Sequence, residues 1–138
     1  MISDKLNCSI YVSTNLSVPE LARIVANFLP KKDDILDAGV HRSTVRGSDF
    51  EADVLLNEDS DLSLRQLFPD GFLHFEKKVE IYVDDGDGSV SARSMSEHVG
   101  ALLRALWMQG FPSVASCDYE DRLPNHGGFN DRTLPWPT

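Results

Sequence analysis

Two stretches of the chain repeat apolar residues with the spacing of an amphipathic helix. In the first, Ser17-Val18-Pro19-Glu20 has the spacing of a capping box, and Pro30 closes the stretch. The second opens with the same spacing in Ser94-Met95-Ser96-Glu97, and Gly110 marks its end. The apolar stripes are Leu21, Ile24, Val25, Phe28 and Leu29, and then Val99, Leu102, Leu103, Leu106 and Trp107. The pattern therefore predicts two amphipathic helices, of which the second ends near Gln109.

Shorter stretches have the alternation or the small apolar residues that are typical of strands. They are residues 6–14, 41–47, 50–56, 72–83 and 113–117. Gly47-Ser48-Asp49 separates the second from the third, which predicts a hairpin. A break at Glu76-Lys77-Lys78 would divide the long fourth stretch into two strands.

The remaining segments are predicted to be irregular. Residues 31–39 are charged and are expected to form a loop, and residues 57–61 are expected to form an acidic surface loop. The apolar residues that follow, Leu62, Leu64, Leu67 and Phe68, indicate a short helical turn or a packed loop. The segment 122–138 is rich in Pro and Gly and is expected to be an extended, non-helical tail.

The order of these elements predicts the fold. One domain covers residues 1–138, because a chain of this length is long enough for one sizeable core and short for two. Two helices that are apolar on one side only should each bury that side against the same face of a sheet. We therefore expect an α+β fold, a two-layer sandwich of a mostly antiparallel sheet with both helices on one face, as a ferredoxin-like variant.

Charge narrows the choice of partners. The chain has 22 acidic and 13 basic residues, a net charge of −9. Such a surface repels nucleic acid and anionic membranes and attracts basic proteins. No apolar run approaches the roughly 20 residues needed to cross a bilayer, and the first residues lack the profile of a signal peptide. We expect a cytoplasmic protein that binds neither membrane nor nucleic acid.

Acidic residues gather at strand ends and in loops, which makes them candidates for binding a basic partner. The candidates are Asp118, Glu120 and Asp121 after the last strand, and Asp49, Glu51, Asp53, Glu58, Asp59 and Asp61 in the middle of the chain. Aromatic residues are enriched among the residues that contribute most to binding, so Tyr119, Phe129 and Trp136 are the candidate anchors.

Catalytic and metal sites find less support. Cys117 with His126 could form a thiol nucleophile and its base, although the neighbouring Asp118 would raise the pKa of the thiol. Metal ligation by Asp118, Glu120, Asp121 and His126 is opposed by alternation along a strand. The segment Asp84–Ser89 imitates only the opening of a calcium loop. We expect no enzyme and no cofactor; a small-molecule or metal-binding regulatory domain and a cryptic hydrolase remain the alternatives.

One part of the chain resembles known proteins. Leu102–Trp107, Gly110–Asp121, Leu123-Pro124 and Gly127–Phe129 resemble the C-terminal half of a group of small, mostly uncharacterised bacterial proteins. Size, acidity and the two-helix layout are similar to those of immunity proteins of bacterial toxin systems, including contact-dependent growth inhibition. That resemblance implies a cytoplasmic inhibitor that binds a cognate basic toxin domain, by charge a nuclease, and blocks its active-site groove.

Overall fold

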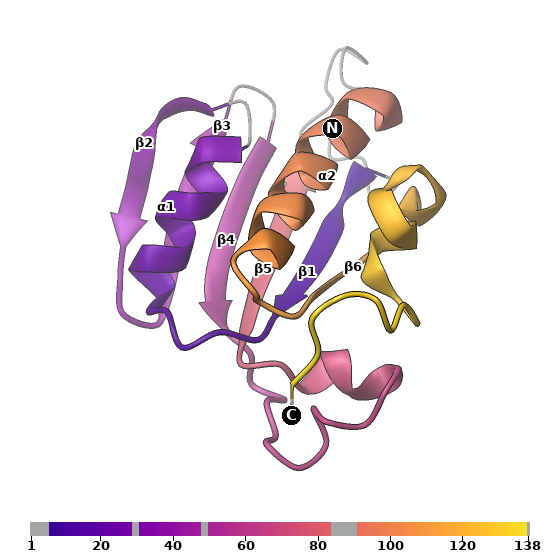
Figure 1. The fold of residues 1–138 in the computed structure, drawn as a ribbon. Coiled ribbons are helices and arrows are strands. Elements are labelled where there is room, and N and C mark those ends of the chain that lie inside the picture. The colour runs from indigo at the N-terminus through magenta and orange to yellow at the C-terminus, as the bar shows by residue number, and fades with distance from the viewer. Residues whose placement is uncertain (1–5, 29–30, 48–49, 84–90, 138) are drawn as a thin grey trace.

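The computed structural model of the chain describes residues 6–28, 31–47, 50–83 and 91–137. Two helices lie on one face of a six-stranded sheet (Figure 1). The strands are β1 Cys8–Val12, β2 Lys31–Ala38, β3 Arg42–Gly47, β4 Phe50–Leu56, β5 Lys77–Val83 and β6 Ser113–Cys117. The helices are α1 Val18–Phe28 and α2 Ala92–Met108. The predicted α+β sandwich is confirmed.

The sheet has the order β2-β3-β4-β5-β1-β6, and all neighbouring strands are antiparallel. Helix α1 connects β1 to the edge strand β2, and α2 connects β5 to β6 on the other edge. The four strands β4-β5-β1-β6 and the two helices reproduce a ferredoxin-like arrangement. The β2–β3 hairpin, inserted between α1 and β4, extends this arrangement at one edge.

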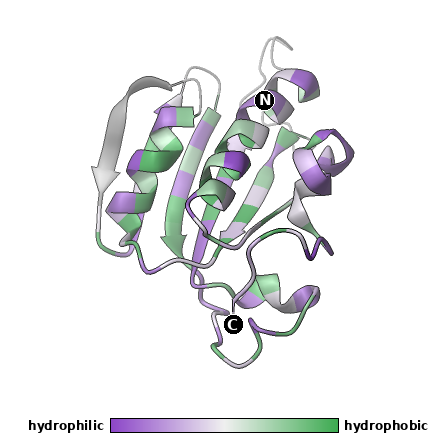
Figure 2. Ribbon diagram, in the orientation of Figure 1, coloured by the Kyte–Doolittle hydropathy of each residue, from purple (hydrophilic) through white to green (hydrophobic). Residues whose placement is uncertain are grey.

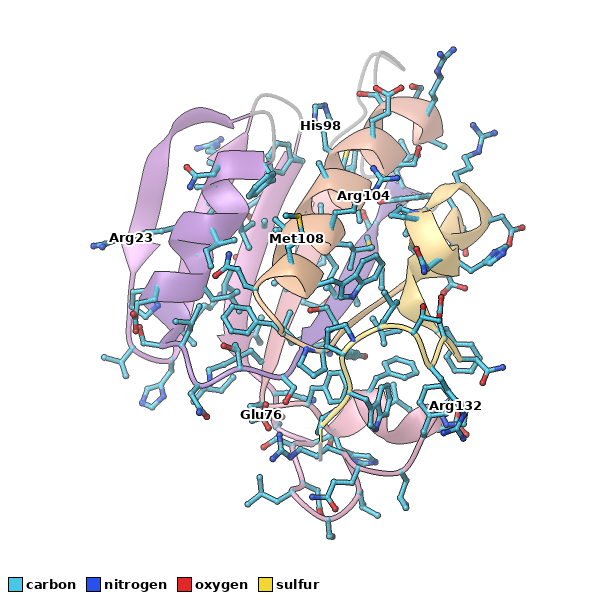
Figure 3. All side chains as sticks on the ribbon, in the orientation of Figure 1. Arg23, Glu76, His98, Arg104, Met108 and Arg132 are labelled. Carbon is cyan, nitrogen blue, oxygen red and sulfur yellow. The ribbon has the colours of Figure 1, made fainter. Side chains whose placement is uncertain are left out.

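Alternation along the strands separates the core from the open side of the sheet. In β1, Cys8, Ile10 and Val12 are buried under the helices, whereas Ser9 and Tyr11 point to the opposite face. Leu21 and Val25 of α1 and Leu102, Leu103 and Leu106 of α2 complete the core. Polar residues lie on the outer side of both helices (Figure 2), and Arg23, His98, Arg104 and Met108 project from it (Figure 3).

The two helix starts differ from each other. The capping box of α1 is confirmed, because the Ser17 N–H donates to Glu20 Oε1 (3.1 Å) and the Glu20 N–H donates to Ser17 Oγ (3.2 Å). For α2 the predicted cap was wrong. Ser91 Oγ accepts from the Ser94 N–H (3.1 Å), so the helix begins at Ala92. Its end was predicted correctly: Gln109 is the C-cap, and Gly110 has φ of +83°.

Two predicted segments were wrong. Residues 31–39 are not a loop, since Lys31–Ala38 forms β2. An edge strand pairs on one side only, and its charged residues discourage pairing with another protein chain, so charge there does not argue against a strand. Residues 72–83 are not extended throughout, because Asp70–His74 forms a 3-10 helix, η2, before β5 begins at Lys77.

The tail is folded against the sheet edge. A short 3-10 turn, η3 Glu120–Arg122, leads into it. A second, η4 Pro124–Gly128, lies within it, so the prediction of a fully extended tail was wrong. Gly127 and Gly128 both have positive φ, and a Cβ atom there would lie 2.9 Å from Ala115 O and 2.8 Å from Ser113 O. Their lack of a side chain lets η4 pack directly on β6, which covers that edge of the sheet.

Candidate partner-binding surface

The connection between β4 and β5, residues 57–76, forms a separate structure beyond one end of the sheet (Figure 1). We call this segment the excursion. Its first residue, Asn57, is only 7% exposed. The Asn57 Nδ2 donates to Leu73 O (2.9 Å) and Phe75 O (2.8 Å), and Asn57 Oδ1 accepts from the Asp59 N–H (3.1 Å). One side chain therefore ties the start of the excursion to its end.

An ion pair forms the second anchor. Arg65 Nη1 lies 2.6 Å from Glu76 Oε1 and 2.9 Å from Ser13 Oγ, and Glu76 Oε2 accepts from the Thr14 N–H (3.1 Å). Glu76 lies at the junction of the excursion and the sheet (Figure 3). Both side chains are 23% exposed, so the pair is partly shielded from water and joins the middle of the excursion to the end of β1.

A small aromatic cluster supports the excursion from the open side of the sheet. Phe72, Phe75 and Val114 are buried in it, and Tyr11 and Trp136 pack against them. The Trp136 ring meets Phe75 edge-on at a centroid distance of 5.2 Å, and its Nε1 donates to Gln66 O (3.1 Å). The tail therefore packs on the excursion and is hydrogen-bonded to it. Because the excursion has this small aromatic core, it is a packed structure.

The outer surface of the excursion combines exposed leucines with polar residues. Among the described residues nine large hydrophobic side chains are exposed, and five of them lie between residues 56 and 73. These are Leu56 (41% exposed), Leu62 (69%), Leu64 (39%), Leu67 (60%) and Leu73 (45%). Figure 2 shows strongly hydrophobic and strongly hydrophilic residues side by side in this region. Four of these leucines come from one anchored segment, and apolar side chains that gather on a protein surface mark contact sites for other proteins.

Acidic residues accompany these leucines. Glu58, Asp59, Asp61 and Asp70 are all exposed. Asp61 Oδ1 accepts from Ser63 Oγ (2.7 Å), the Ser63 N–H (2.9 Å) and the Leu64 N–H (3.1 Å). These hydrogen bonds, that of the Ser63 hydroxyl foremost, lower the pKa of Asp61 from its ordinary value. Asp61 therefore stays ionised while it orders the turn that carries Leu62 and Leu64.

The candidates after β6 lie elsewhere. Asp118 and Asp121 are exposed, Glu120 is half-buried and accepts from the Cys117 N–H (3.1 Å), and Tyr119 is only 4% exposed. The Tyr119 hydroxyl donates to Leu6 O (3.3 Å), and burial raises its pKa. Tyr119 is a core residue and presents no ring to a partner.

The candidates of β4 occupy a third place, the open face of the sheet. Glu51 is exposed there, whereas Asp53 is 4% exposed and binds Thr44 Oγ1 (2.9 Å) and the Arg42 guanidinium. Asp49 lies outside the described residues. Strand pairing places the last residue of β6, Cys117, opposite the first residue of β1. The last residues of β4 and β1 both pair with Lys77 of β5, so these two strands end at the same level. The acids after β6 and those of the excursion are therefore at opposite ends of the sheet.

The two aromatic candidates from the tail both reach the excursion. Phe129 is 43% exposed, and its ring stands edge-on to Phe72 at a centroid distance of 5.9 Å. Trp136 is half-buried between Phe68 and Phe75. The structure thus brings Glu58, Asp59, Asp61, Phe129 and Trp136 to one end of the molecule.

Groups suited to other chemistry are differently arranged. His126 Nδ1 lies 3.8 Å from Asp121, and both side chains are exposed, whereas Cys117 lies opposite Cys8 on the neighbouring strand. Within residues 6–28, 31–47, 50–83 and 91–137, no three His, Cys, Asp or Glu side chains are grouped to hold a metal ion. The predicted calcium-like segment Asp84–Ser89 lies outside these ranges.

A pocket of about 470 Å³ adjoins the ion pair of the excursion. Its polar lining includes Thr14, Glu20, Arg65 and Glu76. Because Arg65 and Glu76 are paired with each other, the opposite charges largely cancel within this pocket.

No match was found among protein-family models, curated proteins or solved structures. In the described part of the chain, neither helix combines the length and the apolar character that crossing a membrane requires.

The sequence names the acids and the aromatic residues of the tail as candidates, but it does not point to the exposed leucines or to Asn57. The sequence predicts a helical turn or a packed loop for these leucines; the backbone does turn there, but the leucine side chains are exposed and not packed. One feature of the sequence does indicate exposure of these leucines. Leucine recurs within residues 62–67, but this segment is too short to form a helix that would bury them in an apolar stripe. Nothing in the sequence marks Asn57 as an anchor, because its partners are carbonyl groups sixteen and eighteen residues away.

Proposed function

We propose that this protein binds and neutralises a cognate basic toxin domain, a nuclease by charge complementarity, and that the excursion is the surface that binds it. The observation that carries the proposal is the exposure of Leu62, Leu64 and Leu67 on a segment that Asn57 and Arg65 hold in place. A loop that is already ordered loses little conformational entropy on binding, so more of the contact energy appears as affinity.

The acids give the same surface its selectivity. Glu58, Asp59, Asp61 and Asp70 lie on a protein with a net charge of −9. An acidic surface accelerates encounter with a basic partner, and the leucines then supply contacts that slow release. Placed over the cationic groove of a nuclease, such a surface excludes the nucleic acid substrate without performing chemistry.

The first experiment is capture of the partner. The tagged protein is incubated at low salt with lysate of the cells that produce it, and bound proteins are eluted with rising salt. We expect a basic protein in stoichiometric amount, released as the salt screens the charges. Nuclease activity of the eluted protein should be inhibited when the acidic protein is added back.

Matched variants then locate the surface. Glu58→Lys with Asp59→Lys reverses two charges on the excursion, and Asp118→Lys with Asp121→Lys makes the same change at the opposite end of the sheet. We expect the first pair to slow association about tenfold or more at low salt and the second pair to have a much smaller effect. Equal effects of the two pairs would show that only net charge matters.

The leucines need their own comparison. Leu62→Ser with Leu67→Ser should accelerate dissociation of the partner by about tenfold or more, because apolar contacts determine how long a complex lasts. Met108→Ser, at an 88% exposed position on α2, is the control and should leave dissociation unchanged. If the leucine variant binds as the unmodified protein does, the excursion is not the binding surface.

A further inference from the structure

The only two cysteines of the chain are paired across neighbouring strands. Cys8, the first residue of β1, lies directly opposite Cys117, the last residue of β6. Both are free thiols. Their proximity is not visible in the sequence, since 108 residues lie between them (117 − 8 − 1).

The register shows which kind of pair they form. In an antiparallel ladder, hydrogen-bonded and non-hydrogen-bonded pairs alternate. The Ser13 N–H donates to Pro112 O (2.8 Å), so these two residues form a hydrogen-bonded pair in the register of β1 and β6. Counting back by alternation makes Cys8 and Cys117 a non-hydrogen-bonded pair. In agreement, the Cys117 N–H donates to Glu120 Oε1 and not to β1.

That geometry suits a disulfide. The Cα atoms of a non-hydrogen-bonded pair are about 4.5 Å apart, and disulfides span Cα distances of about 4.4–6.8 Å. Residues directly opposite each other in an antiparallel pair place their side chains on the same face of the sheet, so the two thiols lie beside each other. A bond between them requires little movement of the backbone.

The two thiols differ in environment. Cys8 is 2% exposed among Leu6 and Tyr119, and Cys117 is partly exposed. Interaction with the neighbouring Cys8 thiol is the largest influence on Cys117 and lowers the pKa of its thiol, whereas burial and the carboxylates of Glu120 and Asp118 raise it. Asp118 raises the pKa of Cys117, as the sequence predicts, but this effect is smaller than the lowering by Cys8. Cys117 is thus the better nucleophile of the pair.

We propose that Cys8 and Cys117 are a reversible dithiol–disulfide pair that is oxidised by a low-molecular-weight disulfide. The Cys117 sulfur attacks one sulfur of that disulfide, and the departing thiolate takes up the proton that Cys117 has lost. The Cys8 sulfur then attacks Cys117 Sγ, and the second small thiolate leaves and takes up the proton of Cys8. The protein loses two hydrogens, and the small disulfide becomes two thiols.

The test uses the full-length protein and oxidised glutathione. The folded protein is incubated with it, remaining thiols are blocked by alkylation, and the product is digested with trypsin without reduction. Cleavage gives one peptide with each cysteine, residues 6–23 and residues 105–122. We expect these two peptides to be joined by a disulfide in a monomeric protein, and to separate after treatment with dithiothreitol.

Single variants separate the two roles. In Cys8→Ser, Cys117 has no resolving partner and should accumulate as a stable glutathione adduct. In Cys117→Ser, the buried Cys8 should remain unmodified while the protein is folded. The proposal is overturned if the unmodified protein accumulates a glutathione adduct or a disulfide-linked dimer through Cys117 instead of the joined peptides, or if neither thiol reacts. This test uses no partner protein, so it stands apart from the toxin proposal.

Discussion

Removing the side chain of Asn57 tests whether the excursion is held in place as the structure indicates. Asn57→Ala deletes three hydrogen bonds, two to the carbonyl groups of Leu73 and Phe75 and one from the Asp59 N–H. Each is worth about 1 kcal/mol net, so the expected loss in free energy of unfolding is about 3 kcal/mol. The hydrogen bond to Phe75 O is buried and the one to Leu73 O is partly buried, so water replaces the second more easily when the side chain is removed.

Urea unfolding measures the loss. The midpoint should fall while the dependence of the free energy on urea concentration stays the same, since that slope reports the surface exposed on unfolding. Asn27→Ala, at an exposed position of α1, is the matched control and should change stability by no more than about 0.5 kcal/mol. If Asn57→Ala costs less than about 1 kcal/mol, Asn57 does not anchor the excursion and the argument for a preordered surface fails.

Three other changes test the rest of the structure, each by urea unfolding. Gly71→Ala should cost about 1–3 kcal/mol, because its Cβ atom would lie 2.6 Å from Leu64 O; a neutral result would contradict this close approach. Ser17→Ala should cost about 1 kcal/mol by removing the cap of α1, and no loss would show that the cap is dispensable. Asp61→Asn should destabilise more at about pH 7 than at low pH, because a lowered pKa gives stability that is present above the unfolded pKa and lost as pH falls through the folded pKa. Equal destabilisation at both pH values would contradict that prediction.

The fold was largely predictable because its elements are specified locally. The stripe of α1, its capping box and the alternation of β1 depend on neighbours within a few residues, and sequence pattern reports such neighbours directly. The same reasoning misplaced the start of α2, because Ser91 and Ser94 are equally suitable caps by residue type. It also missed β2, since the pairing of an edge strand with β3 is not visible in a charged segment such as Lys31–Ala38.

The candidate surface was less predictable because it depends on contacts between distant parts of the chain. Tyr119 looked like an exposed aromatic beside acids, but its hydroxyl reaches Leu6 O across the whole sequence and its ring is in the core. Asp53 was a candidate contact residue in a predicted strand, but its side chain is occupied by Thr44 and Arg42. Leucine looked like a core residue at position 62, where the structure exposes it.

The central claim is that the excursion contacts a basic partner, and amide hydrogen exchange with and without the captured partner tests it most directly. The account predicts that added protection is concentrated in residues 57–74, with little change at residues 118–122 beyond the opposite end of the sheet. Protection concentrated at residues 118–122 or on the open face of the sheet, with residues 57–74 unchanged, would contradict the account.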